Sequence, residues 1–353
     1  MSILFQPLKL RSITLRNRLG ISPMCQYSAV DGVANHWHLV HLGSRAVGGA
    51  GLVIQDATAV SPQGRISPAD LGLYNAAQME ALKPIVEFIK LQGATPGIQL
   101  AHAGRKAGCA VSWEGGAQLM PENGGWLAEV PSALPFKPGE QPPLALDADG
   151  IQQVVDDFSK AARRAFEAGY EVVEIHAAHG YLIHEFLSPL SNHRTDDYGG
   201  SFQNRIRLLL MVVKAVRSEW PARLPLLVRI SATDWMEGGW NADESVQLAS
   251  ILKTLEVDMI DCSSGGLVPN AVIPAEPGFQ VGFAEQIKHQ AHIPVAAVGL
   301  ITNALQAEEI LSSQKADLIL IGRASLADPH FPLHAAKVLG CEIKWPLQYL
   351  RAK

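Results

Sequence analysis

Cysteine is scarce in this chain, and its spacing excludes several kinds of site. The 353 residues include four cysteines, and no two of them form a CxxC pair. Zinc ribbons, iron–sulfur clusters and disulfide scaffolds need closely spaced or paired cysteines, so none of these is expected. Scattered free thiols are typical of a reducing compartment, and the sequence therefore predicts a cytoplasmic protein.

Long apolar runs and an excess of positive charge are also missing. No run approaches the roughly 20 apolar residues of a membrane-spanning helix. Residues 1–18 lack the basic-then-apolar order of a secretory signal. The formal net charge is −5, which provides no basic surface for nucleic acid or an anionic membrane. The expected partners are therefore small molecules, with neither nucleic acid nor membrane among them.

The chain does contain a regular alternation of short apolar runs and longer amphipathic runs. Hydrophobic residues make up 48% of the sequence and charged residues 18%, which is enough for a large folded core. Eight runs rich in Val, Ile and Leu are typical of strands buried on both faces of a parallel sheet. We expect these strands at 18–24, 51–57, 96–102, 171–177, 225–231, 259–264, 294–299 and 318–323.

Segments with helical periodicity separate these strands. In 151–169, Val154, Phe158 and Ala162 fall on one stripe and Gly169 can end the helix. Further helices are expected at 36–47, 76–92, 201–220, 242–256, 279–291, 303–315 and 330–339. A doubly wound open sheet alternates in the same way, but eight strand–helix units in a chain of this length favour an α/β fold of the (β/α)8 TIM-barrel type.

One long segment does not fit the alternation. Residues 104–150 are rich in glycine and proline and are too many for an ordinary loop between a strand and a helix. We expect them to form an insertion after the third strand, over the catalytic end of the barrel. No linker divides the chain, so 1–353 is expected to be a single domain with a C-terminal tail at 341–353.

The stretch EIHAAHGYLIHEF, residues 174–186, concentrates polar groups at the end of the fourth expected strand. His176 falls at the end of that strand, and His179 and Tyr181 fall in the loop after it. In TIM barrels, the carboxyl ends of the strands carry the active site. Three interpretations are open: a metal site, hydrogen-bonded structural histidines, or two neutral histidines that bind a substrate oxygen beside a tyrosine proton donor.

A metal site fits these residues least well. The HxxH spacing at a strand end does not place both rings on one face, as an i, i+4 pair on a helix does. A third ligand would have to be His184 or His193, and no carboxylate stands at an obvious ligand spacing. We therefore expect no metal, and a metal-dependent hydrolase on the same barrel is the alternative.

Other polar residues gather at the same expected end of the barrel. Arg229 lies inside an apolar strand, where a charge needs an anionic or strongly polar partner. Gly299, Gly322 and Arg323 follow the last two strands, whose loops often bind phosphate through backbone N–H groups. These residues predict a phosphorylated ligand at the barrel mouth, or else two turn glycines and a surface arginine.

Several longer motifs together resemble one family over nearly the whole chain. They are SPMCQY, HLGSRAVGGAGLV, ATAVSPQGRIS, IQLAHAGRKA, HAAHGYLIHEFLSPLSNHRTDDYGGSFQNRIRLL and LIGRASLADP. In this order they are similar to the old yellow enzyme family, and most of all to its bacterial thermophilic-like branch of ene-reductases. The resemblance implies noncovalent FMN, NADPH or NADH as the reductant, and an α,β-unsaturated carbonyl or nitro compound as the substrate.

The resemblance also assigns residues to the flavin, from the ends of several strands and the last two loops. These residues are Ser22, Pro23, Met24, Cys25, Ala57, Gln99, Arg229, Gly299, Gly322 and Arg323. Arg229 would lie against the N1/O2 edge of the flavin ring, which would give its charge a partner. Cys25 would tune the redox potential; the alternative is a small buried side chain.

On the substrate side, the resemblance implies that His176 and His179 hold the carbonyl oxygen. Tyr181 would then deliver a proton to the α-carbon on the opposite face from the hydride. The resemblance also places Tyr27 and Lys106 beside the substrate.

The C-terminal tail carries one more implied residue. Arg351 matches an arginine that, in this branch, can reach a neighbouring subunit's active site, which implies a homodimer or homotetramer. The alternative is a solvated tail. Two alternatives to an ene-reductase also stay open: a flavin-binding protein without turnover, and another FMN barrel enzyme such as a dienoyl-CoA reductase.

Overall fold

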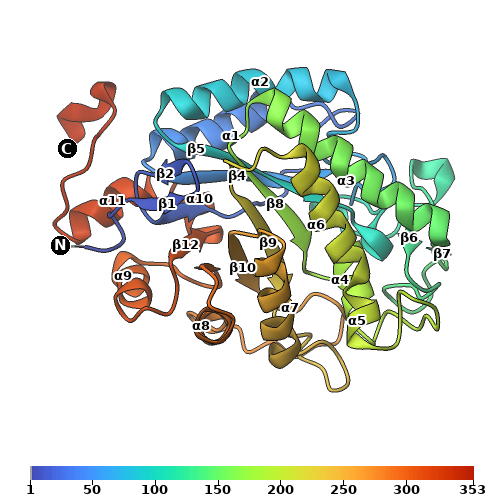
Figure 1. Cartoon of the computed structure of the whole chain (residues 1–353). Coiled ribbons are helices and arrows are strands. Elements are labelled where there is room, and N and C mark those ends of the chain that lie inside the picture. Colours follow the sequence, from blue (N-terminus) through green and yellow to red (C-terminus); the bar gives the residue numbers. More distant parts are fainter. Residues whose placement is uncertain (1) are drawn as a thin grey trace.

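The barrel predicted from the sequence is present. A computed structural model describes residues 2–353, and its central sheet is a closed barrel of eight parallel strands surrounded by helices (Figure 1). The strands follow one another around the barrel in chain order, and the last pairs with the first. They are β3 Leu19–Ile21, β4 Leu52–Ala59, β5 Thr95–Ala101, β8 Val172–Ala177, β9 Leu226–Ser231, β10 Met259–Ser263, β11 Val295–Ala297 and β12 Leu318–Ile321.

Helices cover the outside of the barrel in the positions that the periodicity indicated. They are α1 His36–Val47, α2 Ala76–Leu91, α3 Ala148–Ala168, α6 Arg207–Glu219, α7 Ala242–Thr254, α8 Val281–Ala291, α9 Ala304–Ser312 and α11 Phe331–Val338. Four of them begin at an asparagine whose side chain accepts a backbone N–H of the first turn: Asn35, Asn75, Asn241 and Asn303. Such N-caps satisfy donors that have no partner within the helix.

The prediction of one helix over 201–220 was wrong in detail. The segment forms a short helix, α5 Phe202–Arg205, and then α6, with a break at Ile206. Two further short helices, α4 Leu182–Leu187 and α10 Arg323–Ala327, were not predicted. Helices of five or six residues are too short to show a helical period in the sequence.

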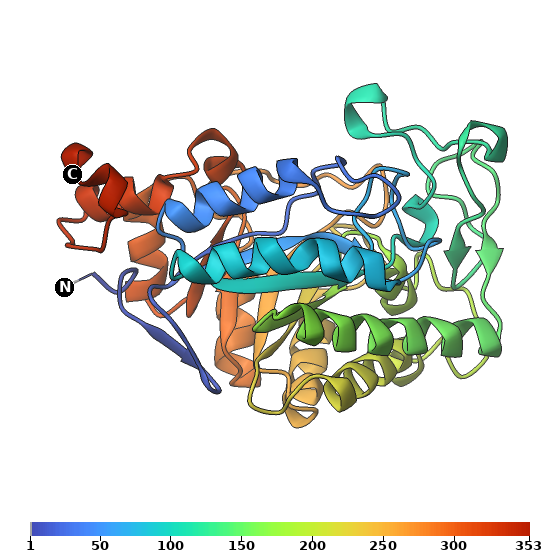
Figure 2. The ribbon, with the colours of Figure 1, turned by 90° about the horizontal axis from the view of Figure 1, so that it is seen from above.

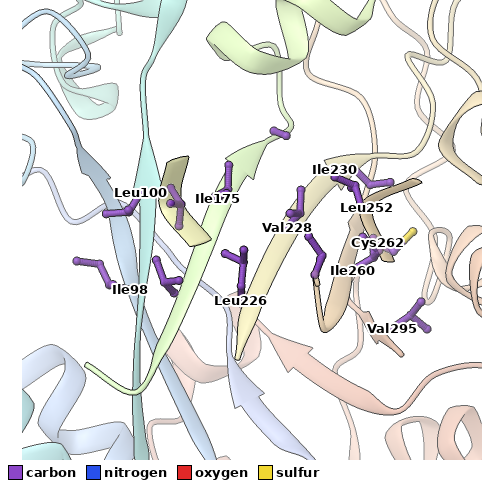
Figure 3. Close-up of a cluster of buried hydrophobic side chains, with 14 of the residues drawn as sticks. Ile98, Leu100, Ile175, Leu226, Val228, Ile230, Leu252, Ile260, Cys262 and Val295 are labelled. Atoms are coloured by element: carbon purple, nitrogen blue, oxygen red, sulfur yellow. The ribbon is translucent and has the colours of Figure 1, made fainter. Parts of the chain in front are cut away.

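The outward faces of the strands pack against the helices. Val228 and Ile230 on β9 lie beside Ile260 and Cys262 on β10, with Leu252 of α7 close to them (Figure 3). All five side chains are fully buried. This apolar shell holds the strand ends in fixed positions, which a site built from several strands requires.

The inward faces of the strands form layers, because every second residue of a strand points into the barrel. The lowest layer is apolar and includes Val172, Leu227 and Met259. An unpredicted antiparallel hairpin, β1 Leu8–Leu10 and β2 Ile13–Leu15, contributes Leu10 and Leu15 to this layer.

Two residues further along β8, β9 and β10, the inward positions become charged: Glu174, Arg229 and Asp261. After another two residues, His176 and Ser231 stand at the mouth. The barrel interior therefore changes from apolar to charged to polar toward its carboxyl end.

The segment predicted as an insertion, residues 104–150, follows the third barrel strand, β5, and its last three residues are the start of α3. The segment also contains short 3-10 turns and a small parallel sheet, β6 Glu129–Val130 with β7 Leu144–Ala145. Figures 1 and 2 show this segment at one end of the molecule and both chain termini at the opposite end. Among residues 2–353, no helix is both long enough and apolar enough to cross a bilayer.

Candidate active site

The carboxyl end of β8 brings together the three residues predicted to be catalytic. The ring centre of His176 is 5.1 Å from that of His179 and 4.8 Å from that of Tyr181, and both pairs are nearly perpendicular. The sequence analysis did not expect HxxH at a strand end to place both rings on one face, yet the structure brings the two rings into contact. His179 has a left-handed backbone, with φ 60°, which turns the loop back toward the strand. A non-glycine residue in this conformation is strained, and such strain concentrates at functional sites.

Both histidines are held as neutral rings. Nδ1 of His176 accepts a hydrogen bond from the Ala178 N–H at 3.3 Å, which leaves the ring proton on Nε2. Nε2 of His179 lies 2.7 Å from the Ser263 hydroxyl oxygen, and either atom can be the donor. Burial, and then the charge of Arg229, lowers the pKa of both histidines well below its usual range. Each ring can therefore donate an N–H at neutral pH without carrying a charge.

Tyr181 immediately precedes helix α4 and is free to donate its proton. Its ring packs against the buried Ala103 and Ala107, and Nζ of Lys106 lies 5.6 Å from the ring centre. Burial raises the pKa of Tyr181 well above its usual range, and no hydrogen bond from residues 2–353 opposes that shift. The phenol therefore stays protonated throughout the neutral range.

Lys106 connects the histidine loop to the insertion. Its ammonium group donates to the carbonyl oxygen of His179 at 2.7 Å and to that of Gly266, and it lies 4.4 Å from the ring centre of Phe136. Burial lowers the pKa of Lys106 to about 8. A cavity of about 200 Å³ opens here. It is lined by residues that include Tyr27, Arg105, Lys106, Cys109, Phe136 and Glu140.

The segment after β3 supplies Ser22, Pro23, Met24, Cys25 and Tyr27, and β4 contacts it. A register shift between Gln55 and Thr58 marks a bulge in β4, which leaves Asp56 and Ala57 out of the regular pairing. One carboxylate oxygen of Asp56 accepts the backbone N–H of Gln26 at 3.2 Å.

Cys25 is half-buried in this segment. Burial, and then the charges of Asp70 and Asp56, raises the pKa of Cys25 well above its usual range, although a hydrogen bond with Tyr27 acts in the opposite direction. Cys25 is therefore a neutral thiol rather than a nucleophilic thiolate.

Arg229 has partners within the chain that the sequence analysis did not identify. Its Nη1 donates to the Ser22 hydroxyl at 3.1 Å, and its Nε forms an ion pair with Asp261 at 3.2 Å. The expectation that a flavin supplies the partner of this buried charge was therefore incomplete. Gln99, which is also buried, donates its amide N–H to Glu174 at 2.8 Å.

The three residues predicted to bind phosphate border one cavity. Gly299, Gly322 and Arg323 line a space of about 260 Å³ at the ends of β10, β11 and β12, together with His179. Gly299 has φ 119°, and a Cβ there would lie 2.8 Å from Nε2 of Gln280. Only glycine satisfies both the backbone angle and the space at this position.

His184 and His193 were considered as third metal ligands, and they lie in different surroundings. His184 is fully buried, and its Nε2 is 2.9 Å from Oδ1 of Asp234, while its Nδ1 accepts the Gly180 N–H. His193 is exposed. Within residues 2–353, no group of three or more His, Cys, Asp and Glu side chains could hold a metal ion.

Arg351 does not lie near the histidine pair of its own chain. It is exposed on the last 3-10 segment, Leu347–Ala352, at the end of the molecule away from the insertion (Figure 2). Its role in a neighbouring subunit's site stays a prediction.

Comparison with known proteins decides the family. A family model described as the NADH:flavin oxidoreductase / NADH oxidase family matches residues 3–341. The chain belongs to this family. An NADPH dehydrogenase from Listeria innocua is 49% identical over 354 residues, which cover 100% of this chain and 99% of that protein. An NADPH dehydrogenase from Bacillus velezensis is 47% identical over 351 residues, which cover 99% and 98%.

A solved structure supports the same assignment for the fold. Morphinone reductase superposes with a TM-score of 0.81 at 29% identity, over 98% of this chain and 91% of that chain. The TIM barrel and the resemblance to the old yellow enzyme family are therefore confirmed. The protein is an NAD(P)H:flavin oxidoreductase.

The family's sequence motifs did not identify every residue that holds this flavin oxidoreductase site together. Ser231 accepts the backbone N–H of His179 at 2.9 Å, and Ser263 bonds to its ring. Both serines are the last residue of a barrel strand, in VRIS and IDCS. The ends of the predicted strands could therefore have identified them. Phe136 and Glu140 come from the insertion, where no motif indicated them.

Proposed function

We propose that this protein binds FMN noncovalently at the barrel mouth and uses NADPH or NADH to reduce the activated C=C bond of α,β-unsaturated carbonyl compounds. One observation carries the proposal: two neutral histidine rings and a protonated tyrosine stand with ring centres 4.8 and 5.1 Å apart at the end of β8. Nitro compounds with a similar acceptor oxygen belong to the same substrate class.

The residues at the mouth suit the parts of FMN. Nη1 of Arg229 donates to Ser22 and Nε faces Asp261, whereas Nη2 makes no hydrogen bond within residues 2–353, so the N–H groups of Nη2 suit the N1/O2 edge of a flavin. Gly299, Gly322 and Arg323 border a cavity that suits the phosphate. The neutral thiol of Cys25 and the bulged Ala57 suit the ring system.

In the proposed mechanism, the chemistry supplied by bound FMN is hydride transfer. Nε2 of His176 and one nitrogen of His179 donate hydrogen bonds to the carbonyl oxygen of the substrate, which polarises the enone toward its β-carbon. The hydroxyl of Tyr181 gives its proton to the α-carbon. Lys106 fixes the histidine loop through the His179 carbonyl, and the insertion encloses the side of the site that holds Tyr27.

The role of His179 depends on Ser263, which gives a matched test. For His179 to donate from Nδ1, its Nε2 must accept the Ser263 O–H, so Ser263→Ala removes the bond that fixes this tautomer. A hydrogen bond contributes about 1 kcal/mol, so phenol binding should weaken by about fivefold. Ser264→Ala is the control, because the Ser264 hydroxyl donates to Gln280 at 2.7 Å, a residue that Ser263 also contacts at 3.4 Å, but makes no hydrogen bond to His179. If a flavin absorbance titration showed that both variants weaken phenol binding equally, this role of Ser263 would be contradicted.

Cofactor content and product analysis test the proposed function. The purified protein should be yellow, release FMN on denaturation, and consume NADPH while converting 2-cyclohexenone to the saturated ketone. Colourless protein that takes up no added FMN would exclude the proposal. Bound FMN without turnover would favour a flavin-binding protein, and stoichiometric zinc or iron would favour a metal-dependent hydrolase.

A further inference from the structure

The middle layer of the barrel interior contains two carboxyl groups and one guanidinium group. Glu174 on β8 and Asp261 on β10 lie on either side of Arg229 on β9. Glu174 and Asp261 are 0% exposed and Arg229 is 6% exposed. Gln99 of β5 completes the surroundings of Glu174. If both carboxyl groups were ionised, this water-excluded layer would carry a net negative charge next to the flavin-binding face.

The hydrogen bonds in this layer leave three carboxyl oxygens without a donor from residues 2–353. Oε2 of Glu174 and both oxygens of Asp261 are buried and have no hydrogen-bond donor within residues 2–353. Within residues 2–353, the one ion pair of Asp261 is with Arg229, at 3.2 Å. Buried carboxylate oxygens without donors are costly, and a proton on one carboxyl group would supply a donor to the other.

The electrostatic environment acts in the same direction as this geometry. Burial, and then the charge of Asp261, raises the pKa of Glu174 well above its usual range. Burial also raises the pKa of Asp261, although the charge of Arg229 opposes that shift. Asp261 is the carboxyl group in contact with Arg229, at 3.2 Å, so it is assigned the negative charge and Glu174 the proton.

We propose that Glu174 and Asp261 share a single proton at neutral pH and act as a positioning pair that keeps the charge behind Arg229 balanced. Without this proton, the two carboxylates would carry twice the charge of the guanidinium. The resulting net negative charge would disfavour an anionic ligand at the N1/O2 edge. This second consequence rests on the proposed function, whereas the shared proton itself does not.

The flavin-free protein tests the shared proton directly. A raised pKa in the folded state means that the folded protein holds more protons than the unfolded chain between the ordinary and the raised value. Stability from Glu174 is therefore lost as pH rises through this window. Glu174→Gln keeps the shape and donates to Asp261 without titrating. Its melting temperature should exceed that of the unchanged protein by a margin that widens as pH rises above the ordinary pKa of a glutamate.

Glu87→Gln is the control for the melting experiment, because Glu87 is an exposed residue on α2. The difference in melting temperature between Glu87→Gln and the unchanged protein should not vary with pH. A constant margin for Glu174→Gln as well, or a lower melting temperature at every pH, would overturn the shared proton.

The flavin midpoint potential tests the charge balance. If one carboxyl group is already neutral, Glu174→Gln should leave the potential nearly unchanged. Glu174→Gln with Asp261→Asn removes the remaining negative charge and should favour reduced over oxidised FMN by at least tenfold, about 30 mV for a two-electron couple. A full shift from Glu174→Gln alone would mean that both carboxylates are ionised and would refute the proposal.

The two experiments separate this inference from the proposed function. Protein that binds no FMN contradicts the proposed function, but the melting comparison still decides whether the proton is shared. The double variant leaves Arg229 buried without its ion-pair partner, and if it does not fold, the two single-variant measurements on Glu174→Gln decide the matter.

Discussion

Tyr181→Phe should slow the reduction of an enone by about 10²- to 10⁴-fold, which is the usual contribution of a positioned general acid. The substitution removes the hydroxyl and keeps the ring that packs against Ala103 and Ala107. The hydroxyl has no hydrogen bond within residues 2–353 and retains its proton at neutral pH, so its loss leaves the rest of the site in place. The flavin should still be reduced by NADPH at close to its original rate.

Separate measurement of the two half-reactions checks this expectation. In anaerobic stopped-flow mixing, the variant should lose its rapid reoxidation by the enone and keep its reduction by NADPH. Tyr198→Phe is the control, because within residues 2–353 the one hydrogen bond of the Tyr198 hydroxyl is to the sulfur of Met211, at 3.6 Å. An unchanged reoxidation rate in Tyr181→Phe would mean that the proton comes from elsewhere.

His176→Ala should lower kcat/KM for enones by about 10²- to 10³-fold, as expected when one donor to a developing oxyanion is removed. Nε2 of His176 carries the ring proton because Nδ1 accepts the Ala178 N–H, so no other tautomer can substitute. The substitution also removes the ring that contacts His179 and Tyr181 edge-on. Binding of a phenol ligand should weaken along with turnover.

The control for this experiment is His193→Ala, which removes an exposed histidine of the same sequence region. It should leave kcat/KM and phenol affinity unchanged. Metal content, measured in parallel, should be low in the unchanged protein and in both variants. Full activity of His176→Ala, or loss of a bound metal in either variant, would contradict the proposed role of the histidine pair.

The strands and the larger helices could be predicted because a TIM barrel imposes simple patterns on the sequence. Short apolar runs mark its strands, and stripes such as Val154, Phe158 and Ala162 mark its helices. The hairpin formed by β1 and β2 was missed because each of its strands has only three residues. Helix α10 was missed for the same reason, since a five-residue helix shows no period.

The site was harder to predict, because its geometry depends on backbone conformation and on strand stagger. Nothing in the HxxH spacing indicates that His179 adopts a positive φ and turns its ring toward His176. The alternation in VVEIHA does place Glu174 and His176 on the same face. The pairing of Arg229 with Asp261, however, follows from the register between β9 and β10, which neither strand's sequence specifies alone.

Anaerobic mixing of the holoenzyme, first with NADPH and then with 2-cyclohexenone, tests the central claim most directly. The flavin absorbance should bleach after the first addition and return after the second, with formation of the saturated ketone in proportion to the flavin reoxidised. Protein without flavin absorbance, or a reduced flavin that 2-cyclohexenone leaves unchanged, would contradict the assignment of this site to enone reduction.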